Sequence, residues 1–118
     1  MTQTPPIESS DFDALLELLD REAMRDVVQM FVGSRSERFA ALTAGLDAGD
    51  AAATAQVFHA MRSAGGQLGA QTLEALCADG ERLSRHGDLA AAAVRASDVA
   101  REFDRCHDWF RAHGWLTD

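Results

Sequence analysis

The sequence contains no lysine: all 11 basic residues are arginines, scattered among 19 acidic residues, and the formal net charge is −8. Nucleic acids and anionic membrane surfaces bind clustered basic residues, so this composition argues against both as partners. The sequence also lacks an apolar run of the roughly 18 residues that a membrane-spanning helix needs. Met1–Ser10 does not join a basic stretch to an apolar one, as a secretion signal does. We therefore expect a cytoplasmic protein.

Cysteine is scarce as well. Cys77 and Cys106 lie far apart and form no CxxC motif, which predicts two reduced thiols in the core. With 118 residues, 47% of them hydrophobic, the chain has enough apolar surface for one core without a metal or disulfide staple. We expect a single domain over residues 11–118.

The first half of the chain predicts two helices. Residues 1–10 are polar and include Pro5–Pro6, which predicts a disordered lead. Ser10 and Asp13 then stand in capping-box spacing and begin a short first helix. Asp20 caps a second, longer helix, whose apolar residues recur every three to four positions up to the turn at Ala48–Gly49. Gly33–Ser34 weakens the middle of that helix.

The second half predicts three more helices. Asp50 caps the third, Asp88 caps the long fifth, which closes at Gly114, and the fourth stops at His86–Gly87, where glycine suits a left-handed residue. The sequence shows no strand pattern. We therefore expect an all-α fold, an up-and-down antiparallel four-helix bundle with the short first helix across one end. The predicted buried stripe of the third helix is Ala53, Val57, Met61, Ala64 and Leu68.

The outward face of the third helix carries the candidate chemistry. Arg62, Ser63 and Gly66 follow His59 by three, four and seven positions, which stacks all four residues on one helix face. Because the opposite face is apolar, His59 is predicted to point to solvent near the middle of the helix. The pattern alone also fits an ordinary exposed histidine on a solvated face.

Two glycines follow this face. Gly65 and Gly66 lie near the end of the third helix, where each costs up to about 1 kcal/mol relative to alanine. One use of that cost is close approach by the backbone of another protein. The alternative is a frayed helix end.

The segment from Phe58 to Ala70, FHAMRSAGGQLGA, resembles the signature of the histidine-containing phosphotransfer (HPt) domain family. In that signature a histidine is followed by any residue, an aliphatic residue, a lysine, small residues and a Leu-Gly pair. The resemblance continues through the apolar residues of the fourth helix, and the helical plan matches from about Asp11 to Gly114. It implies a helical bundle that carries a phosphoryl group on a histidine.

Residue by residue, the resemblance implies that His59 is the phosphorylated histidine and that Arg62 stands where the family usually has lysine. Glu81 lies 22 positions after His59, where some members have a residue that hydrogen-bonds the imidazole. Ser63 replaces a commoner glycine and, together with Gly66, is expected on the partner-docking surface. Gly80 takes a place often filled by a core aliphatic residue, which predicts a locally loose fourth helix.

The implied chemistry needs few groups. Neutral imidazole, whose unperturbed pKa is about 6.5, can attack phosphorus through one ring nitrogen. Glu81 would fix the tautomer from the other nitrogen, and Arg62 would help hold the phosphoryl oxygens. Gly65–Gly69 lacks the lysine-serine ending of a P-loop, and Asp104 and His107 form one pair where a di-iron bundle needs two. We expect no ATP binding, no cofactor and no metal in this chain, and place magnesium and the acceptor aspartate on the partner.

Two functions of different classes follow. The first is a monomeric phosphorelay intermediate, which accepts a phosphoryl group from a hybrid or sensor histidine kinase or a receiver aspartate and passes it to a receiver-domain aspartate. The second is a non-catalytic helical module that docks to a receiver domain or another signalling partner and sequesters it, with His59 unused. The presence of both His59 and Arg62 favours the first, because a pure binding module needs neither.

Overall fold

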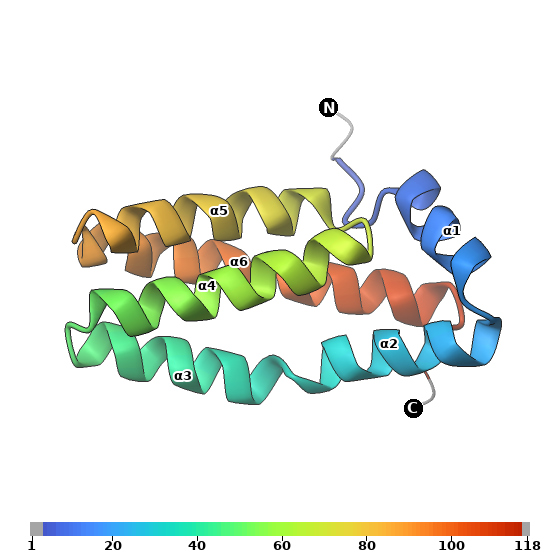
Figure 1. Cartoon of the computed structure of the whole chain (residues 1–118), viewed down its shortest axis with the longest axis horizontal. Helices are drawn as coiled ribbons and strands as arrows, with labels where there is room; N and C mark the ends of the chain where they lie inside the picture. Colours follow the sequence, from blue (N-terminus) through green and yellow to red (C-terminus); the bar gives the residue numbers. More distant parts are fainter. Residues whose placement is uncertain (1–3, 117–118) are drawn as a thin grey trace.

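The computed structural model describes residues 4–116, and over that range it contains helices and no strand (Figure 1). The predicted all-α class is therefore confirmed. No helix in the described range is both long and apolar enough to cross a membrane. The helices are α1 (Ser9–Leu18), α2 (Arg21–Gly33), α3 (Arg35–Asp47), α4 (Ala51–Gln67), α5 (Gln71–Arg85) and α6 (Leu89–Ala112).

The long helices lie side by side. Helix α4 contacts α3 and α5, α5 packs against α6, and α6 also contacts α3. Figure 1 shows these helices running along the long axis of the molecule, with α1 at the end where α2 begins. Helix α1 contacts both α2 and α4. Helix α4, which carries His59, therefore has a partner helix on either side.

Capping signals set several of the helix boundaries as predicted. Asp20, Asp50 and Asp88 cap α2, α4 and α6, and each carboxylate accepts a hydrogen bond from the backbone N–H three residues later. The N···O distances are 2.7, 3.0 and 3.1 Å. Helix α5 ends before Gly87, whose φ of +80° is the left-handed conformation expected there.

The beginning of the chain differs from the prediction. Helix α1 starts at Ser9, and its cap is Glu8, whose side chain accepts a hydrogen bond from the Ser10 N–H at 3.4 Å. Ile7 is fully buried, and the Glu8 N–H donates to the Gly69 carbonyl at 2.7 Å. The predicted disordered lead is therefore wrong for residues 7–10, because one apolar side chain and a backbone hydrogen bond tie this stretch to the bundle. Residues 1–3 of that lead lie outside the described range.

The single long helix predicted from Asp20 to Ala48–Gly49 is also wrong, because it is interrupted at Ser34. The Ser34 hydroxyl donates to the Phe31 carbonyl at 2.7 Å and accepts from Arg38 Nε at 2.9 Å. A serine that bonds the preceding turn in this way competes with the helical backbone pattern, and Gly33 adds a residue of low helix propensity. The weak point at Gly33–Ser34 was predicted, and it separates α2 from α3.

The buried side of α4 is shifted relative to the predicted stripe. Phe58 is fully buried and Ala53 is exposed, so the prediction is wrong at both positions. Met61 and Leu68 are buried as predicted, whereas Val57 and Ala64 lie half-buried at the edge. Spacings of three and four residues fit both the predicted stripe and the observed one. The observed stripe is buried because it contains Phe58, the largest apolar side chain on α4. The polar residue that comes inward with this set is Thr54, whose hydroxyl donates to the Asp50 carbonyl at 2.8 Å.

Gly80 explains how α4 accommodates that phenylalanine. A Cβ atom at Gly80 would lie 2.5 Å from Cε1 of the Phe58 ring, so the ring occupies the space where a side chain would stand. Gly80 is buried, and α5 runs through it without a break. The predicted fourth helix is α5, and the prediction that it is locally loose is therefore wrong. The missing side chain at Gly80 makes room for the large side chain of Phe58 on α4.

Candidate functional site

His59 lies on the outward side of α4, near the middle of the helix. Its side chain is 53% exposed, which confirms the predicted orientation. The preceding residue, Phe58, is fully buried against α5. Because an α-helix turns by 100° per residue, burial of Phe58 directs His59 toward the edge of the α4–α5 contact, where it stays accessible to solvent.

Glu81 on α5 meets His59 at that edge. The distance between His59 Nδ1 and Glu81 Oε1 is 3.2 Å, and the Glu81 side chain is only 12% exposed. An ionised carboxylate accepts hydrogen bonds and cannot donate them, so in this contact Nδ1 is the donor and carries the proton. The other ring nitrogen, Nε2, then holds the lone pair. The structure thus brings together the two residues that the sequence places 22 positions apart.

Two arginines also contact Glu81. Arg62, one turn after His59 on α4, points Nη1 at Glu81 Oε1 at 3.5 Å, which is a long contact. Arg85 donates from Nε and Nη2 to Oε2 at 3.1 and 3.0 Å. Sequence reasoning found Arg62 and missed Arg85. The signal was present, because Glu81 and Arg85 have the i,i+4 spacing at which an acidic and a basic residue pair on a helix.

These contacts control the ionisation of Glu81. Burial of the carboxyl raises its pKa, but the hydrogen bonds from Arg85 and His59, together with the positive charge of Arg85, outweigh burial and leave the pKa of Glu81 below its ordinary value. Glu81 is therefore a carboxylate at neutral pH. A half-buried, ionised acceptor beside Nδ1 is suited to stabilise positive charge on the imidazole.

The glycines after His59 have roles within the chain. Gly65 is buried, and a Cβ atom there would lie 3.0 Å from Cδ2 of Leu73, so Gly65 lets α5 approach α4. Gly66 is half-buried, and the carboxylate of Glu74 occupies the space next to it. Of the two alternatives for this pair, neither partner approach nor a frayed helix end describes Gly65, which serves packing within the chain. At Gly66, which is expected on the docking surface, any partner must meet Glu74. Ser63 is exposed, as a docking residue must be.

Gly69, the second residue of the Leu-Gly pair, is needed for another internal contact. Its φ is +81°, and a Cβ atom there would lie 2.8 Å from the Glu8 carbonyl oxygen. The segment before α1 crosses the α4–α5 turn at this point. The pair therefore serves the fold and not the chemistry of His59.

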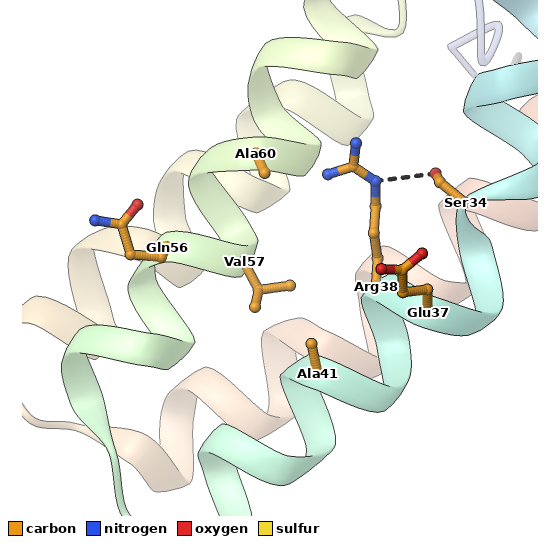
Figure 2. Close-up of a pocket in the computed structure, with 7 residues that line it drawn as sticks. All are labelled: Ser34, Glu37, Arg38, Ala41, Gln56, Val57 and Ala60. Carbon is orange, nitrogen blue, oxygen red and sulfur yellow. Dashed lines mark hydrogen bonds between the residues drawn. The ribbon is translucent and has the colours of Figure 1, made fainter.

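A groove of about 390 Å³ runs between α3 and α4, on the side of α4 away from α5 (Figure 2). Figure 2 shows Arg38 rising from α3, with its hydrogen bond to Ser34 at one end of the groove. A second hollow of about 360 Å³ shares Ser34 and Arg38 and includes Met30, a residue that is 75% exposed. The lining residues in Figure 2 are Ser34, Glu37, Arg38, Ala41, Gln56, Val57 and Ala60.

A smaller, basic hollow of about 260 Å³ adjoins the other side of the site. Arg62 lines it from α4, and Glu81, Arg82 and Arg85 line it from α5, with His86 at the helix end. Arg82 is also paired with Asp79 on its own helix. The exposed imidazole of His59 therefore has arginine side chains beside it, although the chain as a whole is acidic.

Comparison with known proteins places the chain in a family. No curated protein sequence matches the chain. A crystal structure of histidine-containing phosphotransfer protein B (HptB) from Pseudomonas aeruginosa PAO1 is similar to it, with a TM-score of 0.87 and 26% identity over 94% of this chain and 96% of that chain. The model of the Hpt domain matches residues 26–109, a span that includes α3, α4, α5 and most of α2 and α6. The chain therefore belongs to the Hpt domain family.

Proposed function

We propose that the chain is a histidine phosphotransfer protein of a two-component phosphorelay. It accepts a phosphoryl group on His59 from a kinase or a receiver aspartate and passes it to a receiver aspartate. The observation that carries this proposal is the exposed imidazole of His59, with Nδ1 held by the carboxylate of Glu81 at 3.2 Å in a chain of the Hpt family. In this proposal α2 and α3 together form one arm of an up-and-down four-helix bundle, and α1 lies across its end.

The transfer step follows from the tautomer. With the proton on Nδ1, the lone pair of Nε2 attacks the phosphorus of an aspartyl phosphate on the partner. The Nε2–P bond forms, the bond between phosphorus and the aspartate oxygen breaks, and its electron pair leaves with the aspartate as a carboxylate. Transfer to the next receiver runs the same step in reverse. The Nδ1 proton of His59 remains between the ring and Glu81 throughout.

Glu81 and Arg62 stabilise the two charges that develop. Bond formation at Nε2 makes the imidazole ring cationic, and the carboxylate of Glu81 lies against its Nδ1–H. The phosphoryl oxygens are anionic, and Arg62 stands one turn along α4 with a side chain that is 47% exposed. Because its contact with Glu81 is long, Arg62 can turn toward the phosphoryl group without losing a strong hydrogen bond.

The outward face of α4 is the proposed docking surface for the receiver domain and for the hybrid or sensor kinase. Ser63 is exposed beside Arg62, and its small side chain leaves room for a partner to approach His59. The groove in Figure 2 borders the same face through Gln56 and Ala60. Magnesium and the acceptor aspartate belong to the partner in this proposal. The chain itself acts as a cytoplasmic monomer, without nucleotide or cofactor.

Transfer of radiolabelled phosphate from a purified, phosphorylated receiver domain tests the proposal. The native chain should take up label, and His59→Gln should take up none. The change should leave the free energy of unfolding within about 0.5 kcal/mol of native, because His59 is exposed. Label on His59→Gln, or a collapse of its melting temperature, would contradict the assignment. Tight binding of the receiver without transfer would instead support the non-catalytic docking module.

A further inference from the structure

Glu81 divides its two carboxylate oxygens between two residues. Oε1 faces Nδ1 of His59 at 3.2 Å, and Oε2 accepts from Nε and Nη2 of Arg85 at 3.1 and 3.0 Å. The Glu81 side chain is 12% exposed, whereas those of His59 and Arg85 are each 53% exposed. The Glu81 carboxylate is therefore the least exposed member of a chain of contacts that runs from Arg85 to His59.

The two contacts are coupled because a carboxylate is a rigid, planar group. The last torsion of a glutamate side chain has only a broad, two-fold preference, so Glu81 alone does not fix the position of Oε1. Two N–H groups of one guanidinium on Oε2 remove that freedom. Arg62 approaches Oε1 at 3.5 Å, so without Arg85 it would compete with His59 for the carboxylate.

We propose that Arg85 is a positioning residue of the phosphotransfer site, an inference that rests on the proposed function of His59. Arg85 acts through Glu81: by holding Oε2 it keeps Oε1 against Nδ1, so the proton stays on Nδ1 and the lone pair stays on Nε2. If Glu81 and Arg85 formed only an ordinary surface ion pair, removal of Arg85 would leave the tautomer of His59 unchanged. The tautomer of His59 therefore separates the two roles.

Nitrogen-15 NMR of the histidine-labelled protein measures that tautomer without any phosphorylation. In Arg85→Ala the ratio of the Nδ1–H to the Nε2–H form of His59 should fall by about twofold to tenfold, the worth of one net hydrogen bond. Arg85→Lys keeps the charge but not the paired N–H groups, so its tautomer ratio should lie between those of the native chain and Arg85→Ala. Arg82→Ala is the matched control, because Arg82 lines the same hollow and pairs with Asp79. Its ratio should equal that of the native chain.

A double variant tests whether Arg85 works through Glu81. Adding Arg85→Ala to Glu81→Ala should change neither the tautomer ratio nor the rate of phosphoryl uptake beyond the Glu81→Ala values. A further loss would mean that Arg85 acts on the phosphoryl group directly and would overturn the positioning role. Equal tautomer ratios in native, Arg85→Ala and Arg82→Ala would overturn it as well. Failure of the native chain to accept phosphate would count against the proposed function alone, because the tautomer is read independently.

Discussion

Two neighbouring residues of α4 contact two neighbouring residues of α5, and one contact is apolar and buried whereas the other is polar and open to solvent. Phe58 covers Gly80 in the core, where a Cβ would come within 2.5 Å of the ring. His59 reaches Glu81 at the surface, through a polar contact of 3.2 Å. The first contact needs an absent side chain on α5, and the second needs a long charged one. Because the two contacts are adjacent, we expect the packing of the ring on Gly80 to set the helix spacing that the His59–Glu81 pair requires.

The strongest test of this comparison is removal of the ring. Phe58→Ala should lower the free energy of unfolding by about 3–5 kcal/mol, because it leaves a cavity over Gly80 that the helices cannot fill. Denaturant titration followed by circular dichroism measures the loss. Phe58→Leu is the control and should cost clearly less. A loss below about 1 kcal/mol for Phe58→Ala would mean that the ring does not hold α4 to α5.

The converse change fills the space from the other helix. Gly80→Ala should cost about 1–3 kcal/mol through overpacking against the Phe58 ring, and it should also slow phosphoryl uptake, because the displaced helix moves Glu81 away from His59. The same titration and the receiver-transfer assay measure both effects. Combining Gly80→Ala with Phe58→Leu should restore part of both losses, since the two changes share one space. Strictly additive losses would contradict the shared packing.

The sequence predicted the exposed face of α4 better than the buried one. His59, Arg62 and Ser63 share a polar face that periodicity alone identifies, and aspartate caps located the starts of three helices. The buried contact between Phe58 and Gly80 could not be predicted, because a gap in one helix has meaning only once the helix opposite is known. For that reason the sequence alone predicted a locally loose helix at Gly80.

The remaining misses have local causes. Ile7 is one apolar residue in a polar, proline-containing stretch, and periodicity needs several such residues to give a signal. The interruption at Ser34 depends on which carbonyl the hydroxyl bonds. Arg85 could not be predicted from the spacing around His59, because it contacts Glu81 and not the imidazole.

A smaller effect on stability is expected at Glu81, and it depends on pH. Because the pKa of Glu81 is lowered in the folded state, its contribution is present above the unfolded value of 4.5 and is lost as the pH falls through the folded pKa. Native should exceed Glu81→Gln in free energy of unfolding by no more than about 1 kcal/mol at pH 7, since the partners are half exposed. Urea titrations at pH 7, 5 and 3.5 should show this gap closing below pH 4.5. If the difference in free energy of unfolding between native and Glu81→Gln grew toward acid pH, the pKa of Glu81 would have to be raised in the folded state, contrary to the prediction.

The smallest effect on stability belongs to Arg62, and this makes it the cleanest probe of the exposed face. Its side chain is 47% exposed and its contact with Glu81 is 3.5 Å long, so Arg62→Ala should leave the melting curve unchanged. Hydrogen bonds to charged groups are worth about 1.5–3 kcal/mol. Removal of the guanidinium should therefore slow phosphoryl uptake, or shorten the lifetime of phosphohistidine, by roughly tenfold or more.

Arg62→Lys sharpens this test because lysine restores the charge without the planar fork. If charge alone holds the phosphoryl oxygens, Arg62→Lys should behave as native. If the fork matters, it should fall between native and Arg62→Ala. Arg82→Ala, which removes an arginine from the same hollow, controls for the general loss of positive charge and should transfer at the native rate. Equal rates in native, Arg62→Lys and Arg62→Ala would remove Arg62 from the site, and the outward face of α4 would then act through His59 alone, with its support coming from α5.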